Sequence, residues 1–526
     1  MAEQDVERLG FDFFSRLPIV VEAHNTLVTS DAGILPLREF DCQIGLTERF
    51  IACLEDRRDP EQIDHSFAEM VRQRLFGILA GYEDCNDHDA LRNDPAFKMV
   101  SGKAPNDETG LASQPTLSRF ENAVSIACLW RLHDFFLDDF IRSFKTPPAF
   151  LTLDIDAVDD PCHGQQQLAL FHGFYDQYQY LPLVVSCAET KQILWPSLRP
   201  GSVHAALGAD DDLEYIAKRL RAAWPDVVIH VRGDAGFGMP WMYAVCERLQ
   251  LLYTFGLSTN NVLKQAADSL LQRAVRQFEE TRETQRLFDQ FLYRAGSWKN
   301  PRRVIVKAEC NRVGTNLRFI VSNRSGAGIL PQAAYDEYAE RGESENRNKE
   351  LKCGLAGDRL SCHRFVANYF RLMLHTAALN LLVRLRALVA DPPALTAANQ
   401  ADQPSLESSL GAEAEPAAAG DTSPDAALAG SMKSSQDVPV QDPTLPVAAL
   451  TGHERRRYHN YRRRKDPLGQ GHIDTWRTCL IKVAGEVIQS ARRILVRIPA
   501  HWPGLAWFRH VCRRLDELRR SAQVQT

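Results

Sequence analysis

The sequence lacks the features that would place it in a membrane or outside the cell. No run among its 526 residues approaches the ~18 consecutive apolar residues that a membrane span requires. The first residues, MAEQDVERLGFDFF, carry acids where a secretory signal has a basic flank and an apolar stretch. We therefore expect a protein of the cytoplasm that is not integral to a membrane.

Paired cysteines are also missing. The 12 cysteines are scattered along the chain, and no two of them form a CxxC pair. Such spacing argues for reduced thiols, because zinc ribbons need closely spaced pairs and disulfide frameworks occur mainly in small secreted proteins. The sequence therefore predicts neither a structural zinc site nor a disulfide scaffold.

Excess charge of one sign is small overall, but the charges are unevenly distributed. The net charge is −5, yet residues 451–526 hold 17 Lys and Arg against 6 Asp and Glu. Residues 391–450 hold 9 acids, one lysine and no aromatic residue, a composition that cannot build a core. We expect a disordered acidic linker over 391–450 and a basic helical C-terminal region that contacts DNA. A solvated amphipathic helix is the alternative for that region.

The chain before residue 391 divides where the hydrophobic period changes. Residues 1–147 show mainly helical periodicity, as in Ile63–Tyr82, and predict a helical domain. As a hypothesis that periodicity does not support by itself, we expect this domain to serve DNA binding or dimerisation. Residues 148–390 read as strands and helices in the order βββαβαβ. Antiparallel hairpins followed by crossover units are the layout of a ribonuclease H-like α/β core. Residues 258–330 interrupt this alternation and predict an inserted, mainly β subdomain.

Carboxylates mark the ends of two predicted strands. Asp154 and Asp156 are two residues apart on the first strand, so both point to one face of the sheet. Asp234 ends the fourth strand in the sequence GDAGF, where glycines permit a tight turn. A turn-forming aspartate is the alternative for Asp234. Together the three acids predict a carboxylate site at one edge of the sheet.

A fourth acid, Glu345, belongs to a cluster with helical spacing. On a continuous helix Tyr338, Arg341, Glu345 and Lys352 fall at about 0°, 300°, 340° and 320°, so all four share one face. A surface ladder of ion pairs is the ordinary explanation of such a face. The spacing Tyr-x2-Arg-x3-Glu-x6-Lys also resembles the signature of bacterial insertion-sequence transposases that use an Asp-Asp-Glu triad.

The resemblance extends to three further blocks. LDIDAVDDPCHGQQ from Leu153 is similar to the first-Asp block of the DDE group 1 branch, and RGDAGFG from Arg232 is similar to its second-Asp block. QRLFGILAGYEDCNDHDALRNDPAF from Gln73 resembles the N-terminal helical block of that branch. Val158 departs from the pattern, since the family leads us to expect Thr there. The resemblance covers about residues 1–390.

The resemblance implies a cut-and-paste DNA transposase that acts on transposon inverted-repeat ends and target DNA as a homodimer, associated with the bacterial nucleoid. It implies two Mg²⁺ ions, for which Mn²⁺ can substitute, bound to hard carboxylate oxygens. Asp156, Asp234 and Glu345 are then the catalytic ligands, with Asp154 as the rival for the first position. Other residues are expected to contact DNA: Tyr338, Arg341 and Lys352, and in the insertion Trp298, stacking on a base, with Lys299.

Three alternatives stay open at this point. Trp298 is equally well explained as a packed core residue. An inactive, transposase-derived DNA-binding protein would share the fold, and a ribonuclease H-like nuclease without strand transfer would share the carboxylates. Such a nuclease would not need Tyr338, Arg341 and Lys352 beside Glu345.

Overall fold

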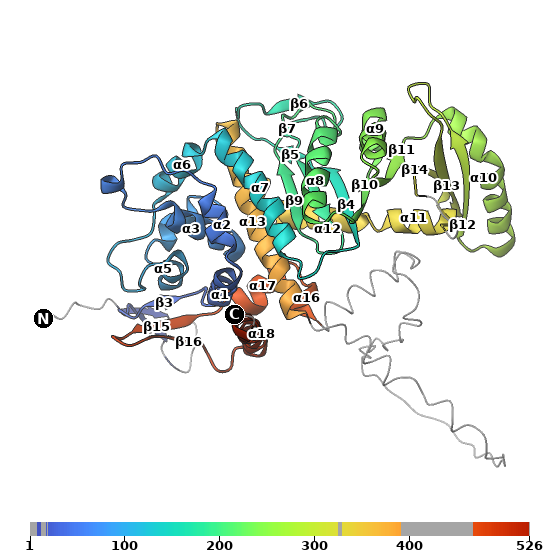
Figure 1. Cartoon of the computed structure of the whole chain (residues 1–526). Helices are drawn as coiled ribbons and strands as arrows, with labels where there is room; N and C mark the ends of the chain where they lie inside the picture. Colours follow the sequence, from blue (N-terminus) through green and yellow to red (C-terminus); the bar gives the residue numbers. More distant parts are fainter. Residues whose placement is uncertain (1–7, 12–16, 18, 325–328, 391–465, 525–526) are drawn as a thin grey trace, which may run out of the picture. The chain divides into compact units, whose positions relative to one another are not determined.

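The computed structural model describes residues 8–11, 17, 19–324, 329–390 and 466–524 (Figure 1). The chain forms two units, residues 1–389 with 471–526, and residues 390–470. In the second unit only Ala390 and residues 466–470 are described, including the short helix α16 (Pro467–Gln470). The expected linker and the basic stretch up to Lys465 lie outside the described residues and stay predictions.

The N-terminal region is mainly helical, as expected, with a few short strands. The strands β1 (Arg8–Phe11) and β2 (Ile19–Glu22) pair antiparallel, and β3 (Val28–Thr29) follows. The helices are α1 (Ile34–Ile44), α2 (Leu46–Ala52), α3 (Phe67–Ala80), α4 (Asp87–Leu91), α5 (Pro95–Ser101), α6 (Gln114–Ala123) and α7 (Ile126–Arg142), with a 3-10 turn at Pro60–Gln62.

Local capping sets the bounds of the helix expected over Ile63–Tyr82. This helix, α3, begins at Phe67 because the Ser66 hydroxyl accepts a hydrogen bond from the Glu69 amide at 3.1 Å. It ends where Gly81 adopts a left-handed conformation with φ of 93°.

An eight-stranded mixed sheet, in the order β12-β13-β14-β11-β10-β4-β8-β9, forms the centre of the chain. β8 and β9 run antiparallel to their neighbours, whereas β10 runs parallel to both β4 and β11. The predicted order βββαβαβ is therefore present and the α/β class is confirmed. Its members are β4 (Phe150–Ala157), β8 (Leu183–Cys187), β9 (Ile193–Ser197), α8 (Ala209–Ala223), β10 (Val228–Gly233), α9 (Pro240–Arg248) and β11 (Leu252–Leu257).

The inserted segment, which the sequence predicted to be a mainly β subdomain, extends this sheet. β14 pairs antiparallel with β11 from Thr254↔Ser322 to Leu257↔Phe319. Without this pairing, β11 would be an edge strand with unpaired backbone groups. The elements of the insertion are α10 (Asn261–Thr281), β12 (Gln285–Tyr293), β13 (Arg302–Asn311) and β14 (Gly314–Ser322), and β13 contacts both α10 and α11 (Pro331–Ala339).

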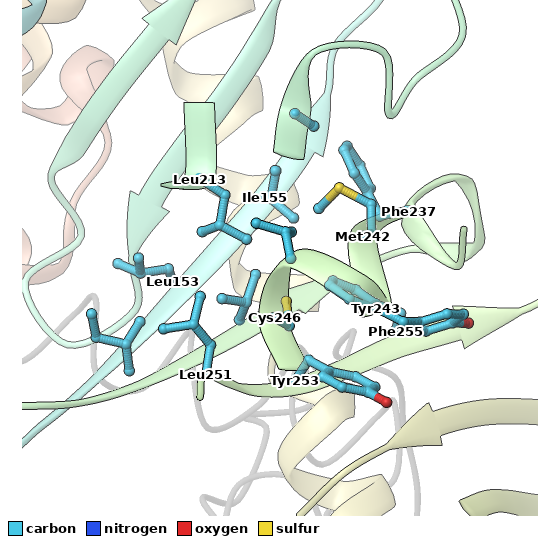
Figure 2. Packing of buried hydrophobic residues seen from close by; sticks show 14 of the residues in the cluster. Leu153, Ile155, Leu213, Phe237, Met242, Tyr243, Cys246, Leu251, Tyr253 and Phe255 are labelled. Carbon is cyan, nitrogen blue, oxygen red and sulfur yellow. The ribbon is translucent and has the colours of Figure 1, made fainter. Parts of the chain in front are cut away.

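The main core lies against one face of β4. Leu153 and Ile155 are almost completely buried in a cluster that includes Leu213, Met242 and Phe255 (Figure 2). Because side chains alternate along a strand, the residues between and after these two project from the opposite face. That face carries the aspartates of β4.

A helical segment follows the insertion and returns the chain to the core. It comprises α11, α12 (Gly342–Lys349), the π-helical turn η3 (Glu350–Gly354) and α13 (Phe365–Val389). Among the described residues, α13 is long and apolar enough to cross a membrane by length and composition alone. However, 78% of its apolar window is buried, and it contacts α3, α6, α7 and β9. We therefore assign α13 as a core helix.

The C-terminal segment packs into the same unit as the N-terminal helices and is not purely helical. It contains α17 (Ile473–Trp476), the π turn η5 (Arg477–Ile481), β15 (Gly485–Gln489), β16 (Ile494–Arg497) and α18 (Leu505–Val524). β15 pairs with β3 on one side and β16 on the other, and α18 contacts α1 and α13.

Close packing explains why this segment is not a free tail. A Cβ at Gly33 would lie 1.8 Å from the Leu480 carbonyl oxygen, so a glycine is required there. Trp476 and Val511 are completely buried. Residues 471–524, which were expected to belong to a basic helical region, therefore include two strands. The alternative of a solvated amphipathic helix is not favoured, because apolar side chains of this segment are buried beside α1.

Candidate active site

Two of the predicted acids lie at the ends of neighbouring parallel strands. β4 and β10 are parallel, with Arg232 opposite Asp154 and Gly233 opposite Ile155. The next residues are Asp156, near the end of β4, and Asp234, which caps a 3-10 turn (Ala235–Phe237) and accepts a hydrogen bond from the Gly236 amide at 2.9 Å. The carboxyl ends of parallel strands are where α/β sheets place ligands.

The third acid comes from a helical segment that is not continuous. α11 ends at Ala339 and α12 begins at Gly342, so Tyr338 lies in α11, Arg341 at the N-terminal cap of α12 and Glu345 within α12. Lys352 lies in the π turn that follows. The angles expected on one straight helix therefore do not apply to the whole cluster.

Arg341 nevertheless joins the acids. One terminal nitrogen lies 3.1 Å from Glu345 Oε1, and the other lies 3.9 Å from Asp156 Oδ2. The guanidinium also lies 5.9 Å from the centre of the Tyr338 ring, within the range of a cation–π contact. Arg341 therefore places a positive charge between the acid of β4 and the acid of α12.

The electrostatics of Asp156 show that three carboxylates share this region. Burial raises the pKa of Asp156 to about 6, Arg341 opposes that rise, and the charges of Asp234 and Glu345 add to it. The Asp156 side chain is only 16% exposed, whereas that of Glu345 is 58% exposed. Asp234 and Glu345 therefore interact electrostatically with Asp156 in a partly desolvated site.

Asn348 is a site residue that the sequence did not suggest. Its amide nitrogen donates a hydrogen bond to Asp156 Oδ2 at 2.9 Å. Asn348 stands three residues after Glu345, hence on the same side of α12, and this spacing was the only signal available. It is a second link between α12 and β4.

The structure separates the two rival aspartates of β4. Asp154 is 1% exposed and each of its oxygens accepts a hydrogen bond from a guanidinium. Those donors are Arg232 and Arg347, so both Asp154 oxygens are already paired with buried guanidinium groups. This geometry favours Asp156 as the ligand from this strand.

Lys352 contacts the loop after β4. Its ammonium donates to the carbonyl oxygen of Asp159 at 2.8 Å and to Asp159 Oδ2 at 2.9 Å. Next to it, Asp160 is 2% exposed, and burial raises its pKa well above the usual range, with the charge of Asp358 adding to the rise. Lys352 thus has a protein partner that a DNA phosphate would have to replace.

Trp298 lies in the core and not at the surface. It is 6% exposed, its ring contacts those of Tyr243 and Tyr293, and the Arg302 guanidinium lies 5.4 Å from its centre. This packing favours the alternative of a structural tryptophan over a role in base stacking. The neighbouring Lys299 is exposed.

Exposed aromatic rings occur instead on a small sheet that precedes β8. This sheet has the order β5-β7-β6, from Asp160–Pro161, Gln177–Tyr180 and Leu170–His172. The site acids lie close to it, because the charges of Asp159, Asp234 and Asp156 add to the burial that raises the pKa of Tyr175. The exposed rings are Phe171 (48%), Phe174 (83%), Tyr175 (37%) and Tyr178 (62%).

The donor chemistry of the site fits a hard divalent cation. Asp156, Asp234 and Glu345 supply carboxylate oxygens and no sulfur or imidazole, which suits Mg²⁺ or Mn²⁺ better than zinc. Within the described residues, however, no three His, Cys, Asp or Glu side chains are already close enough to hold one metal ion. Binding would therefore require the three carboxylates to move closer together.

Comparison with known proteins identifies the family. The model of the transposase DDE domain group 1 family matches residues 11–402. No curated protein matches the sequence significantly. One solved structure, the piggyBac transposase synaptic complex with hairpin DNA, shares 13% identity at a TM-score of 0.37, covering 68% of this chain and 75% of that chain. Since the family model covers most of the sequence, the chain belongs to the transposase DDE domain group 1 family.

Proposed function

We propose that this protein is a DNA transposase that cleaves transposon inverted-repeat ends in a metal-dependent reaction and joins them to target DNA. Family membership indicates DNA transposition. The observation that carries the proposal further is the coupling of Asp156, Asp234 and Glu345 around Arg341, beside the ends of two parallel strands of a ribonuclease H-like core.

Asp156, Asp234 and Glu345 would hold two Mg²⁺ ions. Bound there, the ions would activate a water or a 3′-hydroxyl and stabilise the leaving oxygen of the phosphodiester. Asn348 keeps Asp156 oriented through its hydrogen bond. Arg341 offsets the repulsion among the acids and is placed to meet a phosphate as Glu345 turns inward.

DNA is expected to lie along the exposed side of this site. Lys352 can exchange Asp159 for a phosphate, and Lys299 offers a further positive charge. The exposed rings around Phe174 offer flat surfaces to unpaired bases. Arg341 and Tyr338 would hold the backbone next to the scissile bond, within a homodimeric complex that pairs two ends.

The proposal is tested with Asp156→Asn, Asp234→Asn and Glu345→Gln in the full chain. Each removes a charge that would bind metal while preserving shape, so DNA binding should persist and Mg²⁺-dependent cleavage should disappear. Asp268→Asn, an exposed acid on α10, is the matched control and should cleave normally. Robust cleavage by Glu345→Gln would contradict the triad.

Two readouts separate this function from its alternatives. Wild-type protein that binds end DNA but never cleaves it with Mg²⁺ or Mn²⁺ would be a binding protein only. Cleavage without joining of the cut end to a second duplex would indicate a nuclease that lacks strand transfer.

A further inference from the structure

We propose that Asp154, Arg232 and Arg347, termed here the sheet triad, position the three candidate catalytic acids. The inference rests on the proposed function for the identity of those acids. Its starting point is a regularity in the chain, since each member of the triad is two residues from one acid. Asp154 precedes Asp156, Arg232 precedes Asp234, and Arg347 follows Glu345.

The contacts of the triad centre on the Asp154 carboxylate. Arg232 donates Nε to Oδ1 at 2.7 Å and Nη2 to Oδ2 at 3.0 Å, a two-pronged pair. Arg347 donates Nη2 to Oδ2 at 2.6 Å. All three side chains are buried, with exposures of 1%, 2% and 8% for Asp154, Arg232 and Arg347. Water therefore screens these interactions weakly.

Secondary contacts extend the triad to every element of the site. Arg347 also donates Nε to the Ser186 hydroxyl of β8 at 3.2 Å, and Arg232 donates Nη1 to the Glu337 carbonyl oxygen of α11 at 2.7 Å. Strands β4, β10 and β8 and helices α11 and α12 are thus joined by one set of charged hydrogen bonds.

The helix that carries Glu345 has the greatest need of this connection. The register of Asp156 against Asp234 is already fixed by the backbone pairing of β4 with β10. α12 is a helix outside the sheet, and the side chains of Arg341, Arg347 and Asn348 link it to β4. Of these, the Arg347 link is a buried ion pair of 2.6 Å, against 3.9 Å for the ion pair of Arg341 with Asp156.

The triad is suited to orienting the acids and not to neutralising them. Arg232 also lies 3.7 Å from Glu340 Oε2, so a second carboxylate offsets the charge of its guanidinium. Replacing a group that orients metal ligands typically lowers metal affinity about 10- to 100-fold.

The test uses the full-length protein with Arg347→Met and Asp154→Asn. Arg347→Met removes the links of α12 to Asp154 and to Ser186 and keeps the pair of Asp154 with Arg232, so it should still fold. The matched control is Glu121→Gln, since Glu121 is an equally buried acid held by Arg74 and Arg371 in the helical region. Thermal melting and end-DNA affinity are measured for each variant.

Three measurements report directly on how the sheet triad positions the candidate catalytic acids. Mn²⁺ affinity, measured by calorimetry on the protein alone, should fall about 10- to 100-fold in both sheet-triad variants. The Mg²⁺ concentration for half-maximal cleavage should rise by a similar factor, while KM for end DNA changes less than about twofold. Amide hydrogen exchange over residues 331–354 should accelerate in Arg347→Met. Glu121→Gln should change none of these three.

Wild-type metal dependence and exchange in Arg347→Met would overturn the inference. Equal loss in Arg347→Met and Glu121→Gln would also overturn it, because the effect would then be general destabilisation. If wild-type protein neither binds Mn²⁺ nor cleaves, the proposed function fails, and the exchange of residues 331–354 still decides whether the triad holds α12 in place.

Discussion

Two buried triads of the same chemistry occupy different regions of the molecule. In the helical region Glu121 of α6 pairs with Arg74 of α3 at 2.8 Å and with Arg371 of α13 at 2.7 Å. In the central sheet Asp154 pairs with Arg232 and Arg347 at 2.7 and 2.6 Å. Both carboxylates are nearly or fully buried, so burial and pairing alone do not distinguish them.

The difference lies in what stands next to each triad along the chain. The helical triad joins three helices that carry no candidate catalytic acid. Burial alone would raise the pKa of Glu121, but the two guanidinium groups outweigh it and leave that pKa lowered. The sheet triad has an acid of the site two residues from each member. A buried carboxylate paired with two guanidinium groups therefore joins helices in one region and supports the candidate active site in the other.

The largest effect expected is the loss of cleavage in Asp156→Asn. Removing this charge should lower Mg²⁺-dependent cleavage by at least about 10³-fold, because metal binding supplies several kcal/mol of transition-state stabilisation. Asp154→Asn should lose only about 10- to 100-fold, as expected of an orienting group. Cleavage of an end duplex at one fixed Mg²⁺ concentration, below saturation for the wild type, measures both. An active Asp156→Asn beside a dead Asp154→Asn would reverse the two roles.

Breaking the helical triad should affect stability and not chemistry. Glu121→Ala leaves two buried guanidinium groups without their partner, which should cost about 3 to 5 kcal/mol of unfolding free energy. Urea denaturation followed by circular dichroism gives this value. Cleavage per folded molecule and its Mg²⁺ dependence should equal those of the wild type, and a changed Mg²⁺ dependence would show that the two regions are coupled.

Substitution of Asp156 should raise the stability of the protein, whereas Glu121→Ala should lower it. The pKa of Asp156 in the folded protein, about 6, lies above the usual 3.8, so the folded state binds the proton more tightly than the unfolded state. Stability is therefore lost as pH rises from about 4 to 6, and by pH 7 the loss amounts to about 3 kcal/mol at most. Asp156→Asn should then stabilise the protein at pH 7 and not at pH 4.

The same titration should appear in activity. Mg²⁺ binds the ionised carboxylate, so cleavage should fall as pH drops below about 6. Excess Mg²⁺ should move that midpoint to lower pH, because metal and proton compete for Asp156. A pH midpoint of cleavage that does not change with the Mg²⁺ concentration would contradict the assignment of Asp156 as a metal ligand.

The sequence predicted the strands and the acids because both depend on local pattern. Strand alternation and a turn after β10 indicated Asp154, Asp156 and Asp234, and the resemblance to the transposase signature indicated Glu345. The same alternation could not separate Asp154 from Asp156, since both project from one face. Their difference comes from Arg347, which is 193 residues from Asp154 and whose role no local pattern reveals.

Long-range pairing also explains the elements that were mispredicted. β15 pairs with β3 across more than four hundred residues, so part of the region expected to be basic and helical is a strand of a sheet. The insertion gave a correct β content, but its attachment to β11 depends on an edge that only the assembled sheet provides. Composition describes a segment by itself and does not identify what it packs against.

The contrast between site and scaffold extends, with the smallest effect, to aromatic rings. Phe174 is 83% exposed and its ring lies 5.0 Å from that of Tyr175, which senses the charges of Asp156 and Asp234, whereas Trp298 is 6% exposed. One stacked base is worth about 1 to 3 kcal/mol. Phe174→Ala should therefore weaken binding of an end with unpaired bases by at least about fivefold, leave binding of a fully paired duplex unaffected and preserve thermal stability.

Trp298→Ala should lower the free energy of unfolding by about 3 to 5 kcal/mol, the cost of a large cavity in a core, with the DNA affinity of the folded protein unchanged. Fluorescence anisotropy with the two DNA forms, together with thermal melts, measures the effects of both substitutions. A Trp298→Ala protein that keeps its stability but loses affinity for unpaired ends would show that Trp298 of the insertion, and not the packing role, explains base stacking.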